Sequence, residues 1–511
     1  MRLPSLLGHS AQLLRIIEHS PRPADVLASE YFRSKKYIGA KERRFIAQAV
    51  FSSLRGHSVF AYCAHEALKH IAHDTDAVKA HLQTHGKVGK RSSAEMLFDE
   101  LGVITACCLV GNQVGVGNMF ATIEQSLGIP YQDIEGRIIA LGEAFGERAA
   151  ISQDAGVQFA AALYEYWAML HEEIEAIFDA DEFPEAAQEL IAKRYAVPRW
   201  IMEAWQEESI PPHHDWFQAV ELAASLLSAA PLSLRVNMLG ADRTAVLEIL
   251  RSDGVTAREG KLSPHCITSE QRVNLTATNL YREGTIEIQD EASQLAGFAL
   301  APQQGWRVLD ACAGAGGKSL HIGVLQKNRG EIIASDVEYQ RLKELPVRAR
   351  RSGLTNISTV QLTSKITTNA LPEQLQRYKA QCDAVIVDAP CSGMGTVRRM
   401  PMTKWRLTPD LLRKHAQKQL EILQSFAPAV KDDGVLLYST CSLMPQENEH
   451  VVRAFLAANP DFTPEALAPH FAENNVHIPG LHKDVAMLTL TPAQHGTDGF
   501  FVARLRKNGN A

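Results

Sequence analysis

The stretch Arg-Val-Leu-Asp-Ala-Cys-Ala-Gly-Ala-Gly-Gly-Lys-Ser, residues 307–319, decides the fold. It begins as a short apolar strand and continues into glycines, which let the backbone turn sharply before the helical pattern that follows. Similar apolar runs recur between helical patterns at residues 331–336, 357–363, 384–390 and 434–441, and two more candidates follow at 485–492 and 499–505. Apolar strands joined by helices predict a doubly wound, mostly parallel α/β sheet, in which ligands bind at the carboxyl ends of the strands.

The glycine-rich loop matches neither of two common phosphate-binding motifs. A Walker A loop requires a glycine where this chain has Cys312, and the dinucleotide fingerprint requires one where it has Ser319. What remains is a loop of the kind that holds a nucleoside cofactor. Asp336 ends the second strand 20 residues after Gly316, a spacing at which an acidic residue accepts hydrogen bonds from a ribose diol. Nicotinamide and S-adenosylmethionine enzymes share this pair, and a helix N-cap is the structural alternative for the aspartate.

Two cysteines and one aspartate also lie at the carboxyl ends of predicted strands. Asp388 and Cys391 follow the fourth strand, and Cys441 ends the fifth. Because a thiolate is an attacking species, this set indicates nucleophilic catalysis. Methylation of a pyrimidine at C5 needs such a set, since thiolate addition to C6 turns C5 into a nucleophilic enamine carbon and a carboxylate stabilises the adduct. The target base must be unstacked for this chemistry. The residues alone do not rank the two thiols.

The remainder of the chain predicts two further parts. Apolar residues recur at spacings of three and four up to about Leu190, so residues 1–190 are expected to form an all-helical N-terminal region. Residues 191–284 contain a strand, a helix and further strand-like runs, which predicts a small α+β module. Residues 285–511 would then form the Rossmann-like domain.

Composition excludes several classes of protein. The chain has 511 residues, 46% hydrophobic and 22% charged, which is typical of globular proteins. Its first residues lack the apolar region of a signal peptide, and the longest apolar stretch, from Leu101, is interrupted by polar residues before it could span a bilayer. The 8 cysteines form no Cys-x-x-Cys pair, so we expect free thiols and no metal site. We expect a cytoplasmic protein that does not bind membranes and acts as a monomer.

Charge is unevenly distributed along the sequence. The net charge is -6, yet residues 121–210 carry 18 acidic against 5 basic residues, and residues 341–420 carry 15 basic against 5 acidic ones. Such asymmetry predicts a localised site for a polyanion, although a solvated basic helix at residues 341–351 would explain part of it. The candidates for phosphate contacts within the basic block are Arg398, Arg399 and Lys404.

Several motifs, in order, resemble one known family. They are residues 286–295 (IEIQDEASQL), 310–319 (DACAGAGGKS), 388–401 (DAPCSGMGTVRRMP), 438–449 (YSTCSLMPQENE) and 496–505 (GTDGFFVARL). Together they resemble the NOL/NOP/Sun family of RNA (cytosine-5) methyltransferases, the bacterial Sun/Fmu type in particular, from about residue 190 to the end of the sequence. Residues 41–57 are similar to the NusB-like helical domain of bacterial members.

The resemblance implies a class I methyltransferase fold that uses S-adenosylmethionine to methylate C5 of cytosine in RNA, with 16S ribosomal RNA as the preferred substrate. It also implies that the small α+β module at residues 191–284 binds RNA. Carried over by motif, Cys441 would be the nucleophile, Cys391 would assist product release, and Asp388 would contact both the target cytosine and the cofactor. The cofactor would be held by Cys312, Ala313, Gly314, Ala315, Gly316, Gly317, Lys318, Asp336, Thr363 and Asp388. Thr363 stands where the family usually has an aspartate, and Met402 stands where it has another.

Other interpretations remain open at this point. Transfer RNA is the alternative substrate, and a non-catalytic RNA-binding or ribosome-assembly factor with the same fold is the alternative from another class. Loss of either thiol or of Asp388 would favour the non-catalytic interpretation, and all three are present. An NTPase is disfavoured by Cys312, and a DNA substrate is disfavoured by the second thiol.

Overall fold

The computed structural model describes residues 1–72, 75–84, 98–116, 128–130, 132–178, 185–206, 216–271, 273–362 and 370–509. The chain divides into two compact units, which are described in turn. The first comprises Met1–Ala229 and Val397–Arg406, and the second comprises Ala230–Thr396 and Leu407–Ala511.

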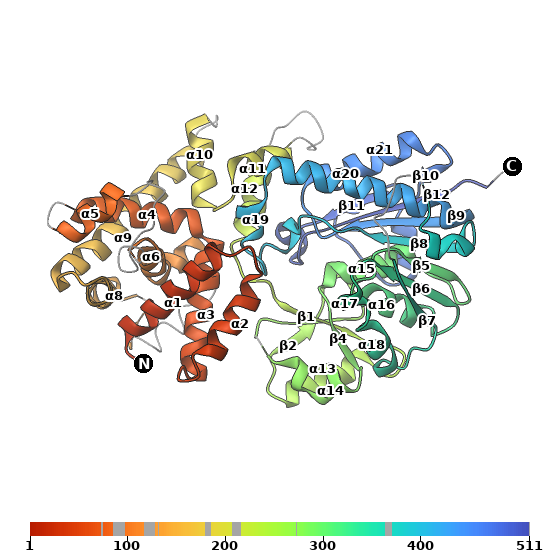
Figure 1. Ribbon diagram of the computed structural model, residues 1–511, viewed down its shortest axis with the longest axis horizontal. Helices are drawn as coiled ribbons and strands as arrows, with labels where there is room; N and C mark the ends of the chain where they lie inside the picture. Colours follow the sequence, from red (N-terminus) through yellow and green to blue (C-terminus); the bar gives the residue numbers. More distant parts are fainter. Residues whose placement is uncertain are drawn as a thin grey trace. The chain divides into compact units, whose positions relative to one another are not determined.

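The second unit is built on a large mixed sheet (Figure 1). Its strands are β5 (Arg307–Asp310), β6 (Glu331–Asp336), β7 (Ile357–Gln361), β8 (Cys382–Asp388), β9 (Val430–Thr440), β10 (Phe462–Pro464), β11 (Met487–Leu490) and β12 (Phe500–Lys507). The order is β10-β12-β9-β8-β5-β6-β7, and β11 also pairs with β12. Strands β5 to β9 are parallel, whereas β12 runs antiparallel to β9, β10 and β11. The chain changes direction across the sheet between β5 and β8, which is where ligands bind in doubly wound folds.

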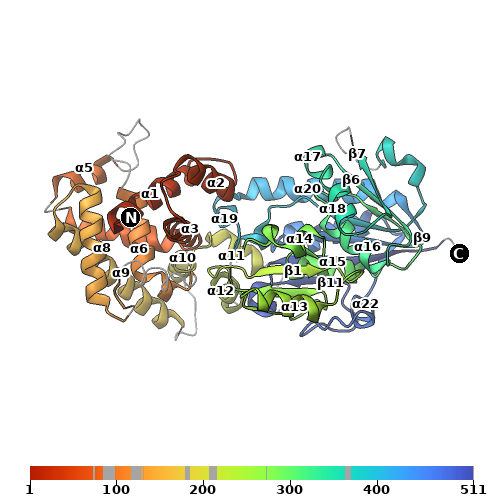
Figure 2. The same cartoon turned by 90° about the horizontal axis from the view of Figure 1, so that it is seen from below.

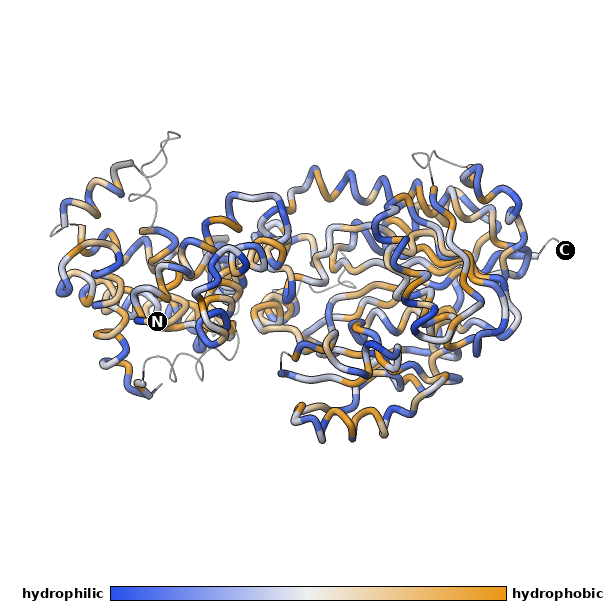
Figure 3. Tube along the Cα trace, turned by 60° about the horizontal axis from the view of Figure 1, so that its bottom comes forward, coloured by the Kyte–Doolittle hydropathy of each residue, from blue (hydrophilic) through white to orange (hydrophobic). Residues whose placement is uncertain are grey.

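Helices cover both faces of this sheet. Along β8, Val385 and Val387 pack into one apolar cluster, and Ala384 and Ile386 pack into another, as the two-residue period of a strand requires. The strands are accordingly coloured as hydrophobic along much of their length in Figure 3. One cluster includes helices α20 (Pro409–Phe426) and α21 (Glu449–Ala458), and the other includes α15 (Glu291–Leu300), α16 (Gly317–Leu325) and α22 (Ala468–Glu473). The predicted doubly wound α/β sheet is confirmed.

Local sequence explains where the longest of these helices begins. The Thr408 hydroxyl accepts a hydrogen bond from the Leu411 amide, and Pro409 occupies the first helical position, where it has no amide hydrogen to leave unpaired. The apolar residues of α20, including Ile422, Leu423 and Phe426, are buried against the sheet. This amphipathic pattern fixes which side of the helix faces the core.

A small antiparallel sheet completes the second unit (Figure 2). Its order is β2-β3-β1-β4, and its elements are β1 (Leu232–Val236), α13 (Arg243–Ser252), β2 (Ala257–Glu259), β3 (Cys266–Ser269), α14 (Asn279–Arg282) and β4 (Ile286–Ile288). The carboxylate of Glu287 in β4 is 3% exposed and pairs with Arg348 and Arg351 of helix α18 (Leu345–Arg351). These ion pairs join the small sheet to the helix that precedes β7.

The first unit is helical wherever the structure describes it. Its helices are α1 (Leu3–Glu18), α2 (Ala24–Ser34), α3 (Ala40–Arg55), α4 (His57–Ile71), α5 (Asp76–Thr84), α6 (Phe98–Val114), α8 (Ile134–Ala149), α9 (Gln153–Phe178), α10 (Glu185–Arg194), α11 (Arg199–Gln206), α12 (Trp216–Ser225) and α19 (Thr403–Arg406). Helix α6 is buried around most of its circumference, because it is apolar on all sides. None of the helices in the described part of the chain is both long and apolar enough to cross a membrane.

The compact units divide the chain at a different place from the predicted boundary at residue 190. Helices α11 and α12 belong to the first unit, which extends to Ala229. The break at residues 195–198 suggested a new part of the chain, but Pro198 only precedes the next helix, as proline commonly does. Strand β10 was not predicted, because its three residues carry no apolar run.

Candidate active site

The loop between β5 and α16 depends on glycine at one position above all. Gly316 has φ of 85°, in the left-handed region, and a Cβ placed on it would lie 2.1 Å from Cδ1 of Leu345. Gly314 also has a positive φ, of 53°, but a Cβ there would meet nothing within 4 Å. The loop therefore turns through two left-handed residues, and only one of them is also sterically enclosed.

The second strand fixes this loop through Asp336. One carboxylate oxygen of Asp336 accepts a hydrogen bond of 2.7 Å from the Gly314 amide, and the other accepts one from the Glu338 amide. The aspartate is thus partly a structural cap, as the alternative interpretation allowed. It also remains at the carboxyl edge of the sheet, next to the loop, as the ribose-binding interpretation requires.

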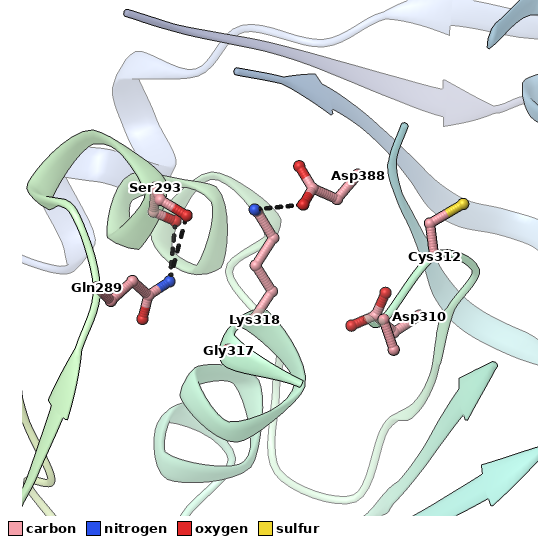
Figure 4. Close-up of a pocket in the computed structure, with 8 residues that line it drawn as sticks. Gln289, Ser293, Asp310, Cys312, Gly317, Lys318 and Asp388 are labelled. Atoms are coloured by element: carbon pink, nitrogen blue, oxygen red, sulfur yellow. Dashed lines mark hydrogen bonds and ion pairs between the residues drawn. The ribbon is translucent and has the colours of Figure 1, made fainter. Parts of the chain in front are cut away.

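A small pocket opens at this edge of the sheet (Figure 4). The residues that line it are Gln289, Ser293, Asp310, Cys312, Ala313, Gly317, Lys318 and Asp388. Five of them, Cys312, Ala313, Gly317, Lys318 and Asp388, were predicted from the sequence as cofactor-binding residues. Thr363 lies outside the described residues.

Sequence reasoning missed three residues of this pocket, Gln289, Ser293 and Asp310. Gln289 and Ser293 belong to the motif at residues 286–295, which was quoted for the resemblance but given no chemical role. Asp310 ends the first strand, and its position at a carboxyl end was the available signal. One of its oxygens accepts a hydrogen bond from Ser319, whereas Oδ1 has no hydrogen-bond partner, and burial raises the pKa of this carboxyl to about 7.

Lys318 and Asp388 form an ion pair inside the pocket. The Lys318 Nζ atom lies 2.6 Å from Oδ2 of Asp388, and Ser439 donates a hydrogen bond of 2.9 Å to the other oxygen. In Figure 4 the lysine extends from the start of α16 toward the aspartate at the end of β8. The carboxylate is therefore oriented from two sides, and its side chain keeps 31% exposure.

The two predicted catalytic thiols lie in contact. Sγ of Cys391 is 3.3 Å from Sγ of Cys441, although the two residues are 50 positions apart in the sequence. The loops that carry them are also joined through backbone, because the Gly395 amide donates to the Cys441 carbonyl. A Cβ on Gly395 would lie 2.0 Å from the carbonyl oxygen of Gly499, so this close approach requires glycine.

The thiols differ in acidity. The pKa of Cys441 is lowered, chiefly because the Cys391 thiol donates a hydrogen bond to it, and the Lys318 ammonium acts in the same direction against the effect of burial. The pKa of Cys391 is raised well above its usual range by the same hydrogen bond and by burial. Cys441 is therefore the better thiolate and Cys391 the proton donor of the pair. The distance of 3.3 Å suits a hydrogen bond in either direction, so this ordering follows the pKa directions of the two thiols and their catalytic roles stay a prediction.

The structure corrects the predicted phosphate contacts. Lys404 is fully buried in the first unit, where its ammonium donates to the Arg55 carbonyl, and burial lowers its pKa to about 7. Arg398 is 7% exposed and donates to the Ala229 carbonyl. Neither side chain can reach a phosphate from these positions, because Val397–Arg406 packs among the helices of the first unit. Arg399 is partly exposed and stays a candidate.

The wider basic block is divided between the two units. Val397–Arg406 belongs to the first unit and the rest of residues 341–420 to the second. Arg348 and Arg351 share the buried carboxylate of Glu287, which offsets one of their two positive charges. A run of charges in sequence therefore overstates the charge that is available to a polyanion.

Comparisons with known proteins identify the relatives of this chain. Residues 297–506 match the family described as 16S rRNA methyltransferase RsmB/F, and residues 197–276 match the ferredoxin-like domain of RsmF/B-like methyltransferases. The probable ribosomal RNA small subunit methyltransferase B of Bacillus subtilis is 34% identical over 334 residues, which cover 65% of this chain and 70% of the relative. The protein of the same name from Synechocystis is 32% identical over 62% of this chain and 68% of its own. The crystal structure of PH0851 has a TM-score of 0.66 and 25% identity, and the match covers 99% of both chains.

Proposed function

The chain belongs to the RsmB/F family of methyltransferases, the Sun/Fmu type of the NOL1/NOP2/Sun family, and from this premise we propose that it methylates C5 of cytosine in ribosomal RNA through a covalent cysteine–C6 adduct. The observation that carries the proposal is the pair of thiols in contact, next to an oriented carboxylate and a cofactor loop. The relatives named above are ribosomal RNA methyltransferases, which is why we propose ribosomal RNA as the substrate.

The pocket residues fit S-adenosylmethionine, the cofactor of this family. The fit is seen at Gly314 and Gly317, where a Cβ would meet no protein atom within 4 Å and the loop leaves open space, and in Asp310, whose buried Oδ1 atom has no partner within the protein. We propose that residues 312–318 and Asp336 hold the cofactor. When bound, S-adenosylmethionine supplies the methyl group.

The chain's own residues then activate the cytosine. We propose that the Cys441 thiolate forms a bond to C6, which moves electron density onto C5 and makes that carbon nucleophilic. Its lowered pKa and the nearby Lys318 ammonium favour the thiolate. Asp388 would accept a hydrogen bond from the exocyclic amine of the cytosine and stabilise the adduct, and the contacts from Lys318 and Ser439 orient it for this role.

Product release requires two further changes. A base, for which solvent water suffices, must accept the C5 proton, and the electron pair of the C5–H bond then forms the C5–C6 double bond. At the same time the bond between C6 and the Cys441 sulfur breaks, its electron pair returns to sulfur, and the ring regains its aromaticity. Cys391 lies 3.3 Å from the departing sulfur and can donate a proton to it. We therefore propose that Cys391 assists release, whereas Cys441 makes the covalent bond.

Trapping experiments on the two cysteines test this mechanism. Cys441→Ala should abolish methylation and form no covalent complex, and Cys391→Ala should accumulate a protein–RNA adduct that survives denaturing electrophoresis. Adduct in Cys441→Ala but not in Cys391→Ala would reverse the roles, and activity in both variants without any adduct would refute the covalent mechanism. A protein that neither methylates RNA nor forms an adduct would be the non-catalytic assembly factor.

The substrate is tested separately. Bisulfite mapping of ribosomal and transfer RNA, from cells with and without the gene, should show one or more cytosines in ribosomal RNA that lose protection. A change confined to transfer RNA would identify the alternative substrate. We further propose that the chain works as a monomer in the cytoplasm, which light scattering and fractionation would check.

A further inference from the structure

A buried carboxylate lies behind the two thiols and is not used by the proposed mechanism. Glu447 is the last residue of a short 3-10 helix, η5 (Pro445–Glu447), and is 0% exposed. Among the described residues, no Lys, Arg or His lies within ion-pair distance of its carboxylate. A buried charge without a cation is costly unless hydrogen bonds replace the lost water, so its contacts indicate what it is there to hold.

The carboxylate receives hydrogen bonds from both loops that carry the thiols. Oε1 accepts from the Ser392 amide at 2.7 Å, and Oε2 accepts from the Ser392 hydroxyl and the Ser442 hydroxyl, each at 2.5 Å. Ser392 directly follows Cys391, and Ser442 directly follows Cys441. One side chain thus fastens the residues next to both sulfur atoms.

Glu447 accepts a fourth hydrogen bond, and its own backbone segment is anchored to the sheet. Gln419 of α20 donates to Oε1 at 2.9 Å. The segment that carries Glu447 is itself held to β9, because Tyr438 donates to the Glu447 carbonyl and Thr440 donates to Asn448. Glu447 therefore cannot shift without disturbing the strand that ends at Cys441.

We propose that Glu447 is a positioning residue that clamps the Cys391 and Cys441 loops together through Ser392 and Ser442, and thereby sets the contact between the two sulfur atoms. The catalytic meaning of the clamp rests on the proposed function. Glu447 is not placed to accept the C5 proton, since four hydrogen bonds occupy its oxygens and none of the side chain is exposed.

The clamp has a consequence for the chemistry of the thiols. The negative charge of Glu447 opposes ionisation of both thiols, so the lowered pKa of Cys441 depends on the hydrogen bond from Cys391 and on Lys318 rather than on this charge. Loosening the clamp should separate the sulfur atoms, remove this hydrogen bond and raise the pKa of Cys441. The effect can be measured without RNA or S-adenosylmethionine.

The test is alkylation of the full-length protein by iodoacetamide as a function of pH, with the modified cysteine identified by mass spectrometry. In the wild type, Cys441 should react in preference to Cys391. Glu447→Gln keeps the volume but removes the charge, and loss of the charge alone would lower the pKa of Cys441 and speed its reaction. The clamp predicts the opposite: Cys441 should react about tenfold more slowly at pH 7, as a rise of one pKa unit implies, and the share of modification at Cys391 should increase. Glu465→Gln is the matched control, since that carboxylate binds Arg504 and Arg506 in the same unit and touches neither thiol loop.

The outcomes separate the clamp from the proposed function. If Glu447→Gln is folded and Cys441 reacts as fast as in the wild type or faster, the clamp is refuted, whatever the methylation activity. The double variant Ser392→Ala and Ser442→Ala removes the same hydroxyl contacts and keeps the charge of Glu447. An unchanged profile in that double variant refutes the clamp equally, whether or not Glu447→Gln folds. A changed profile in a protein that never methylates RNA would support the clamp and reject the proposed function. Loss of preference in Glu465→Gln as well would show that the effect is general destabilisation and would overturn the proposal.

Discussion

Three glycines in one loop allow a prediction that separates backbone strain from steric enclosure. Gly314 and Gly316 both have positive φ, but a Cβ would clash only at Gly316, with Leu345. Gly317 begins α16 with ordinary φ, and a Cβ there would meet nothing within 4 Å. Alanine at Gly317 therefore imposes neither backbone strain nor a clash. Alanine at Gly314 imposes the backbone strain alone, and alanine at Gly316 imposes both the strain and the clash with Leu345.

The magnitudes follow from these differences. Gly317→Ala should leave the free energy of unfolding within about 0.5 kcal/mol of the wild type. Gly314→Ala should lower it by about 1–2 kcal/mol, the cost of a left-handed residue with a Cβ. Gly316→Ala carries the same cost and about 1–3 kcal/mol of overpacking against Leu345, so it should lose about 2–5 kcal/mol.

Urea unfolding of the three variants, without ligand and at one protein concentration, measures these differences. The wild type and Gly317→Ala serve as the references. If Gly316→Ala is as stable as Gly314→Ala, the enclosure by Leu345 does not matter and the reasoning fails. If Gly317→Ala is as unstable as the other two, the loop is sensitive to any side chain and the backbone argument fails as well.

Three further perturbations test other parts of the site. Asp336→Ala should weaken S-adenosylmethionine binding by about 1–3 kcal/mol in calorimetry, because it leaves the Gly314 amide unpaired; unchanged affinity would contradict the assigned cofactor site. Burial raises the pKa of Asp310 to about 7, so the folded state binds a proton that the unfolded state releases between about pH 4 and pH 7, and stability should fall as pH rises through that window. Asp310→Asn should reduce this loss of unfolding free energy between about pH 4 and pH 7 by at most about 4 kcal/mol. A pH profile of unfolding identical to that of the wild type would refute the raised pKa of Asp310. Lys404→Met should leave RNA affinity unaltered in filter binding while Arg399→Ala weakens it, and the opposite result would restore Lys404 as a phosphate contact.

Much of the fold could be predicted because it depends on local patterns. Strands such as β6 and β8 are short apolar runs between helical patterns, and their two-residue and 3.6-residue periods are visible without any knowledge of distant contacts. The exceptions are equally local in origin. Strand β10 has too few residues to show a period, and the proline before α11 marks the start of a helix as readily as the start of a domain.

The candidate site was predictable in part. Cys391, Cys441 and Asp388 were found because each follows a strand, and carboxyl ends of parallel strands meet at one edge of the sheet. The prediction that Lys404 contacts phosphate failed because local sequence does not show whether a side chain is buried. A lysine in a basic stretch is expected to be exposed to solvent. In the structure this segment packs among the helices of the first unit, and the Lys404 ammonium donates a hydrogen bond to the Arg55 carbonyl, 349 positions away in sequence.

Local patterns in the chain were enough to predict most strands and helices in their order, with β10 as an exception, and to locate the glycine-dependent loop and the reactive side chains at the edge of the sheet. These follow from backbone preferences and from burial of apolar faces, which act over a few residues. Only the tertiary structure decided which of those side chains meet: the two thiols, separated by 50 residues in sequence, and Lys318 with Asp388, separated by 70. It also decided that Glu447 lies behind both thiols. Such contacts depend on how distant segments pack, and hydrogen bonds and pKa values change over distances of an ångström that no pattern in the sequence records.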